Sequence, residues 1–301
     1  MLKQFNLHYC NELYAKYIYR TRDTTNLSVV LRFEIQALYD HLSDFSKPWR
    51  INIGHVIARE PLLTTYSDSS FNGIGFWSDE MRVICMIPTC QHIRNRCELQ
   101  NNRDPKRIYM NQLEYIGSII DYACILYVLE DDECEPLRRQ LFPQGIPPMP
   151  RTLSMKDNKA SETWIRKAAT KSFMGQQLIR IMGELGRDSG VMQDSAHIPG
   201  EDNKEADVLS RPDKPNGYRL DQAALVAHFD DTIAKYPRFA NYQVFLPSQN
   251  LLSAVVWALR PVAVATPTDL IPPPLTKPYG RLVSCAEFRV SMEILYDQKE
   301  Y

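Results

Sequence analysis

The apolar segment at residues 111–129, NQLEYIGSIIDYACILYVL, constrains the fold more than any other feature of the sequence. Its length and composition predict a long apolar helix. Strand-like segments lie on both sides of it, at residues 62–67 and 151–156. Two strands separated by such a helix are expected to pair in parallel through a right-handed crossover, so the segment predicts an α/β fold.

Two more strand-like segments follow residues 62–67 directly, at 73–77 and 81–87. Turn signals at Asn72-Gly73 and at Ser78-Asp79-Glu80 predict that the three strands form an antiparallel meander. A second helical region at 160–186 and a last strand at 191–198 complete the order β-β-β-α-β-α-β. This order predicts a mixed five-stranded sheet with helices on both faces.

The remaining parts of the chain carry no visible chemistry. Residues 1–57 show two helical patterns and are expected to form a helical extension. After Arg211 the sequence PDKPNG is followed by an amphipathic region, and then by the proline-rich PVAVATPTDLIPPPLTKPYG. We therefore expect three parts: a helical region at 1–57, the α/β domain at 58–212, and a partly helical, otherwise irregular extension at 213–301.

Charge and apolar runs limit the class of protein. The formal net charge is −1, so attraction to a polyanion would have to come from a local cluster of cations. No apolar run is expected to reach the length of a bilayer span; the longest candidate, residues 251–259, is ended by Arg260 and Pro261. The first residues lack an apolar signal-peptide centre, and the seven cysteines have no framework spacing. We expect an intracellular protein, cytoplasmic or nuclear, with no membrane partner.

Acidic residues stand where the expected elements would bring them together. Asp68 and Asp157 lie at the ends of two strands expected to be parallel neighbours. Side-chain alternation places Asp68 on the face of Leu62, Thr64 and Tyr66 and Asp157 on that of Leu153 and Met155, and we expect both faces to point to the core. Glu114 is expected in the first turn of the intervening helix, where the helix dipole favours a negative charge. Asp207 begins the helical segment after the last strand. Each residue alone is also explained as a turn or helix-capping residue.

Four converging carboxylates cannot all remain ionised without a compensating cation. Two Mg²⁺ ions about 3.5–4 Å apart would satisfy them and could activate water against a phosphodiester. Mn²⁺ is a possible substitute. Carboxylate spacing therefore predicts a two-metal hydrolase.

Four segments resemble the ribonuclease H domain of retroelement reverse transcriptases, most closely that of DIRS-type retrotransposons. They are YSDSSFNGIGFW, MNQLEYIGSI, SMKDNKAS and HIPGEDNKEADVLSR, in the order of the family, and they cover about residues 58–212. The resemblance implies a ribonuclease H-like fold and a D-E-D-D metal site on Asp68, Glu114, Asp157 and Asp207. It also implies a mobile histidine ahead of the last aspartate, which matches His197 and would shuttle protons or aid product release.

The chain also departs from the family pattern. Residues 88–107 form an insertion, and no aspartate pair of the YxDD type is found upstream, so the chain cannot copy nucleic acid. Residues 1–57 resemble the end of a polymerase thumb or connection region. The resemblance implies a fragment of a retrotransposon polyprotein, a truncated copy of such an element or a domesticated remnant. As a fragment, its partner would be the polymerase domain of the parent reverse transcriptase.

The helical region after Asp157 carries a local excess of cations. Its lysines and arginines are Lys159, Arg166, Lys167, Lys171, Arg180 and Arg187, against Glu162 and Glu184. A solvated helix face is one explanation of this pattern. The other is that Asn158, Lys159, Arg166, Lys167 and Lys171 hold the phosphates of a nucleic acid, with binding that weakens steeply with salt.

Together these features predict an endonuclease that hydrolyses the RNA strand of RNA–DNA hybrids by two-metal-ion catalysis. Recognition would depend on 2′-hydroxyl contacts in a wide minor groove and not on base sequence. The alternative is a non-catalytic nucleic-acid-binding remnant of the same fold. A nuclease of this fold that acts on DNA is a third possibility.

Overall fold

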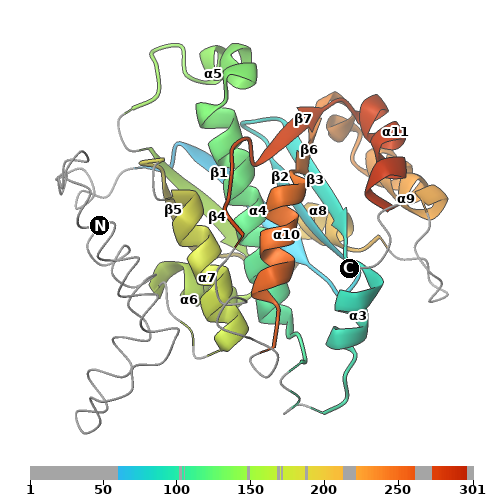
Figure 1. Ribbon diagram of the computed structural model, residues 1–301. Helices are drawn as coiled ribbons and strands as arrows, with labels where there is room; N and C mark the ends of the chain where they lie inside the picture. Colours follow the sequence, from blue (N-terminus) through green and yellow to red (C-terminus); the bar gives the residue numbers. More distant parts are fainter. Residues whose placement is uncertain are drawn as a thin grey trace, which may run out of the picture.

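One mixed sheet runs through the part of the chain that the structure describes, with seven strands in the order β5-β4-β1-β2-β3-β6-β7 (Figure 1). The computed structural model describes residues 60–101, 104, 106–147, 150–167, 170, 172–186, 189–212, 222–261 and 273–296. The helical region expected at 1–57 lies outside these residues. The strands are β1 (Leu63–Ser69), β2 (Gly73–Ser78), β3 (Val83–Pro88), β4 (Arg151–Lys156), β5 (Met192–His197), β6 (Gln243–Pro247) and β7 (Gly280–Val283).

The described helices lie between the strands in the sequence and after the last strand. Those described are α3 (Gln91–Cys97), α4 (Met110–Glu130), α5 (Glu135–Leu141), α6 (Lys159–Lys167), α7 (Phe173–Gly186), α8 (Lys204–Ser210), α9 (Gln222–Lys235), α10 (Gln249–Ala258) and α11 (Cys285–Tyr296). The predicted helical region at 160–186 is thus two helices, α6 and α7. Part of the predicted insertion at 88–107 forms α3.

Strand pairing confirms the predicted meander and crossover. β1 pairs with β2 and β2 with β3 in antiparallel fashion, whereas β4 lies parallel to both β1 and β5. Helix α4 connects the meander to β4, as expected for a crossover between parallel strands. The predicted α/β class with a mixed sheet is confirmed.

The predicted sheet of five strands was too small, because β6 and β7 come from the chain after residue 213. β6 lies parallel to β3, and β7 pairs antiparallel with β6. Val244, Phe245 and Leu246 are buried, so this strand belongs to the core. The expectation of an irregular extension is therefore wrong for these residues: the strand patterns QVFLP and GRLV are too short to show a clear alternation.

Helices cover both faces of the sheet. On one face Phe76 and Cys85 pack with α4, α7 and α10, and on the other Trp77 and Ile84 pack with α8, α9 and α11. Helix α8 approaches β2 very closely: a Cβ atom on Gly75 would lie 2.5 Å from Cβ of Leu209. A glycine is required here, and it allows α8 to lie directly against the strands that carry the site.

Helix α4 is the central helix of the larger core. It is long and apolar enough, by length and composition, to cross a membrane, so the expectation that no apolar run reaches bilayer length was wrong for this helix. The whole of its most apolar window is buried inside the protein against the sheet and α7. Such burial is typical of a core helix, and the length criterion alone is weak evidence of a membrane span.

The expectation that the faces of Asp68 and Asp157 point to the core was wrong. On β4, Leu153 and Met155 are half-buried, whereas Thr152, Ser154 and Lys156 on the opposite face are fully buried. On β1, Leu62, Thr64 and Tyr66 are likewise half-buried, whereas Leu63, Thr65 and Ser67 are buried. The buried face is polar because it meets Asp121, a fully buried carboxylate in the middle of α4. A hydrophobicity pattern cannot predict which face is buried when the buried face is polar.

Candidate metal centre

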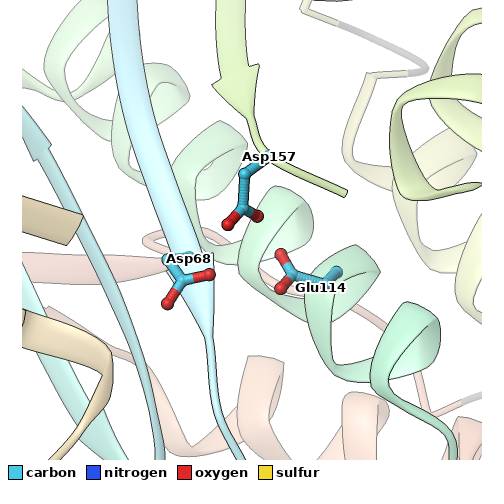
Figure 2. A group of neighbouring side chains, drawn as sticks. All are labelled: Asp68, Glu114 and Asp157. Atoms are coloured by element: carbon cyan, nitrogen blue, oxygen red, sulfur yellow. The ribbon is translucent and has the colours of Figure 1, made fainter. Parts of the chain in front are cut away.

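Three of the four predicted acids converge at one end of the sheet. Each of Asp68, Glu114 and Asp157 offers a carboxylate oxygen, and these oxygens all lie within 4.8 Å of one another. Figure 2 shows Asp68 on β1, Asp157 at the end of β4 and Glu114 on α4, with their carboxylates directed at one another. The prediction that acidic residues from separate elements meet at one place is therefore confirmed for these three residues.

Strand register explains why the two aspartates meet. β1 and β4 are parallel, with Tyr66 opposite Met155. Asp68 and Asp157 both lie two residues beyond this pair, so the chain brings them to the same level at the carboxyl ends of neighbouring strands. Carboxyl ends of parallel strands are a common place for ligand sites in α/β sheets.

Glu114 reaches the site from the second turn of α4, and not from the first turn as predicted. The helix begins at Met110, and its first turn contains no acidic residue; its capping box is formed by Tyr109 and Gln112. The start of α4 is held against β1 by Ser69, whose hydroxyl donates to the Leu113 carbonyl at 3.1 Å, directly before Glu114. Its position therefore depends on packing against β1 more than on the helix dipole.

Keeping the carboxylates of the cluster ionised is unfavourable, because they are buried and lie close to one another. Burial raises the pKa of Glu114 well above its usual range, and the nearby Asp68 charge raises it further. Burial also raises the pKa of Asp68; a hydrogen bond from Ser210 opposes this, while Asp157 and Asp207 add to it. Glu114 is 2% exposed, and its Oε2 atom has no hydrogen-bond partner among the described residues.

These features fit a hard divalent cation. Mg²⁺ and Mn²⁺ accept carboxylate oxygens as ligands, and a cation would offset both the repulsion and the missing partner of Glu114 Oε2. A buried polar atom without a partner normally costs about 1–3 kcal/mol. Asp68, Glu114 and Asp157 are thus the residues able to hold the ion.

A prediction about stability follows for Glu114. The folded protein holds a proton on this carboxyl more tightly than the unfolded chain does, so its contribution to stability is lost as the pH rises above the ordinary carboxyl range. We expect Glu114→Gln to stabilise the metal-free protein at neutral pH by about 1–2 kcal/mol. Thermal unfolding in the presence of a chelator measures this. Below the ordinary carboxyl range the two proteins should unfold at the same temperature, and a less stable variant at neutral pH would contradict the expectation.

Asp207 lies next to the cluster but outside the group of three. It is in the first turn of α8, and its Oδ1 accepts a hydrogen bond at 2.5 Å from Nε of Arg211, one turn further on. The Ser210 hydroxyl, in the same helix, lies 2.6 Å from Asp68 Oδ2 and 2.9 Å from the Asp207 carbonyl. Helix α8 therefore contacts the site through Ser210, while the Asp207 carboxylate is paired with a guanidinium.

Comparisons with protein-family models, with curated proteins and with solved structures found no match. Any functional conclusion therefore depends on the residues and their geometry.

His197 is the last residue of β5, where it lies opposite Lys156, and its side chain is exposed. The loop after it returns to the cluster: a Cβ atom on Gly200 would lie 3.3 Å from Asp157 Oδ2. The predicted histidine is therefore exposed and lies on the strand next to β4, the strand that Asp157 follows. Its role stays a prediction.

The predicted nucleic-acid contacts are described only in part. Asn158 Oδ1 accepts hydrogen bonds from the backbone of Ala160 and Ser161, at 2.9 and 3.1 Å, so this side chain caps α6. Lys159 is exposed beside the site. The side chains of Arg166 and Lys167, and all of Lys171, lie outside the described residues.

Two residues of the site were not predicted from the sequence. Ser210 donates to Asp68, and Lys156 lies fully buried directly before Asp157. Ser210 carries no sequence signal, because serine near a helix end is common. Lys156 had a signal: a lysine that alternates with Thr152 and Ser154 on one strand face.

Proposed function

We propose that the chain is a divalent-metal-dependent endonuclease of the ribonuclease H type, which hydrolyses the RNA strand of RNA–DNA hybrids. The observation that carries the proposal is the convergence of Asp68, Glu114 and Asp157, with a buried Glu114 oxygen that lacks a partner. Support also comes from the α/β sheet with parallel β1, β4 and β5, and from the four segments that resemble retroelement ribonuclease H domains.

The residues of the cluster have distinct roles in this proposal. Asp68, Glu114 and Asp157 hold the cation at the strand ends, and Ser210 orients Asp68 by its hydrogen bond. Asp207 becomes a fourth ligand if Arg211 turns to the substrate; an exposed ion pair of this type contributes at most about 1 kcal/mol, so its loss is cheap. When bound, Mg²⁺ supplies Lewis-acid activation of water and charge stabilisation on the phosphate.

Other side chains around the cluster would bind substrate. In the proposal Lys159, exposed at the start of α6, holds a phosphate, and the exposed His197 moves a proton or aids product release. A requirement for RNA would come from 2′-hydroxyl contacts in the minor groove. As a polyprotein fragment, the chain would work inside the cell beside the polymerase domain of its parent.

A cleavage assay with matched substrates tests the proposal. The whole chain is incubated with an end-labelled RNA–DNA hybrid, and with duplex DNA and duplex RNA of the same sequence, in Mg²⁺, in Mn²⁺ or in a chelator. We expect cutting of the RNA strand of the hybrid alone, and only with a divalent ion. Cutting of duplex DNA would identify a DNA nuclease. Hybrid binding without cutting in either ion would identify the non-catalytic remnant and would refute the proposal.

A further inference from the structure

A buried ion pair lies directly behind the acidic cluster. Asp121 in the middle of α4 and Lys156 at the end of β4 are both fully buried, and Lys156 Nζ lies 3.7 Å from Asp121 Oδ2. The Lys156 ammonium also donates a hydrogen bond to the Ser67 hydroxyl. Nothing in the proposed reaction uses this pair.

The pair belongs to a network that joins the elements of the site. Asp121 Oδ2 accepts hydrogen bonds from Ser154 of β4 at 2.5 Å and from Thr65 of β1 at 3.3 Å. Asp121 Oδ1 accepts one from Gln193 of β5 at 2.6 Å. The network therefore fixes α4 against β1 and β4, which are the elements that carry Glu114, Asp68 and Asp157.

Two residues of the network are also sequence neighbours of the two aspartates of the cluster. Ser67 directly precedes Asp68, and Lys156 directly precedes Asp157, so the two contacting side chains lie on the opposite strand faces from the two aspartates. The Lys156 ammonium contacts Asp121 on α4, the helix that carries Glu114, and Ser67 on β1, the strand that carries Asp68. One ammonium thus interacts with both the ligand-bearing helix and the ligand-bearing strands.

Stability alone does not explain such a pair. Removing two ions from water costs several kcal/mol each, and an apolar pair of similar volume is often as stable or more stable. A role in placing other groups is the better-supported use of buried polar contacts. At this location the groups to be placed are the three carboxylates.

We propose that Lys156 is a positioning residue of the metal centre: its ammonium, fixed by Asp121 and Ser67, holds Asp68, Glu114 and Asp157 in converging positions before a cation binds. The inference rests on the part of the proposed function that assigns a divalent ion to these carboxylates. It does not depend on the substrate.

Positioning and simple electrostatics predict different results when the pair is removed. The Lys156 ammonium repels a divalent ion and the Asp121 carboxylate attracts it, so if the pair acted only through its charges, removing both would leave metal affinity nearly unchanged. If Lys156 positions the carboxylates, its loss lets their mutual repulsion separate them, and metal binding weakens. If the pair only supports the fold, metal affinity stays the same and only stability changes.

The test is a Mn²⁺ titration of the double variant Asp121→Asn/Lys156→Met, followed by electron paramagnetic resonance of the free ion. Both charges are removed together, and the Thr65 and Ser154 hydroxyls can accept hydrogen bonds from the new amide. We expect Mn²⁺ affinity about ten- to a hundredfold below that of the wild type, the range found when groups behind metal ligands are replaced. Unchanged or tighter binding would overturn the inference.

A matched control removes another ion pair that involves β4. Arg151 at the start of β4 pairs with Asp194 of β5 at 2.6 Å, at the opposite end of the strand from the site. The variant Arg151→Met/Asp194→Asn should bind Mn²⁺ as the wild type does. A similar loss in both double variants would indicate a general effect of weakened strands, and would count against Lys156 as a positioning residue.

A milder variant covers the case in which the double variant fails to fold. Ser67→Ala removes one hydrogen bond of Lys156, and we expect it to weaken Mn²⁺ binding about fivefold, as for one hydrogen bond of ordinary strength. Ser195→Ala, a buried serine of β5 that donates to the Ser154 carbonyl, should leave Mn²⁺ affinity unchanged. Equal affinity in Ser67→Ala and wild type would overturn the inference.

The two proposals can fail separately. If the wild type binds Mn²⁺ and the variants bind it less well, but no hybrid is cut, the positioning role stands and the nuclease proposal fails. If the wild type cuts hybrids and all variants bind Mn²⁺ equally, the positioning role fails and the nuclease proposal stands. A wild type that binds no Mn²⁺ overturns both.

Discussion

Replacing Asp68 with asparagine is expected to reduce cleavage of an RNA–DNA hybrid by at least about a thousandfold, since a metal ligand supplies several kcal/mol of transition-state stabilisation. Asp68 is 4% exposed and carries one of the three converging oxygens, so the change removes a charge from the centre of the site. Asp157→Asn should have the same effect. Initial rates on a labelled hybrid, at saturating Mg²⁺ and again at saturating Mn²⁺, measure the loss.

The control for this prediction is Asp202→Asn, an exposed carboxylate in the loop after β5. It should cleave at the wild-type rate. The Asp68→Asn protein should also remain folded without metal, because burial and like charges raise the pKa of the wild-type Asp68 carboxyl and the amide carries no such cost. Undiminished cutting by a folded Asp68→Asn protein would remove Asp68 from the site.

The largest expected effect on stability comes from Asp121→Asn alone. This change keeps the shape of the side chain but leaves the fully buried Lys156 ammonium without its counter-ion. Breaking a buried pair in this way typically costs about 3–5 kcal/mol. Chemical denaturation of the metal-free protein measures it, and the double variant with Lys156→Met should recover most of the loss because no charge is then left unpaired.

A surface pair provides the comparison. Asp194→Asn breaks the Arg151–Asp194 pair, whose side chains are 30% and 38% exposed, and such pairs contribute at most about 1 kcal/mol. Asp121→Asn should therefore destabilise several times more than Asp194→Asn. Equal losses would mean that water or another group reaches Lys156, and that the pair does not behave as buried.

Periodicity and turn signals were enough to predict the central strands, α4 and their order. The site followed from that order, because residues at the ends of parallel neighbours must meet: Asp68 and Asp157 are at one level, and Glu114 reaches them from α4. The helix start was placed too late in sequence, since Tyr109 and Gln112 form the capping box and Glu114 does not contribute to it.

Other parts of the site depend on contacts between distant residues, which local patterns do not encode. Asp207 was expected among the ligands, but Arg211, one helical turn away, pairs with it. The alternation of Lys156 with Thr152 and Ser154 marks a polar strand face, but no local pattern indicates that Asp121 on α4 is its partner. Whether Asp207 joins the other carboxylates stays a prediction.

The attachment of β6 to β3 has a practical consequence for dissecting the protein. If the chain were cut after residue 212, β3 would become the outer strand of the sheet, with Val83 and Ile84 no longer paired to Gln243 and Val244. An uncovered hydrophobic strand edge favours pairing between molecules and aggregation. An insoluble shortened chain would then reflect a missing neighbour in the sheet, and would say nothing about whether the carboxylates bind metal.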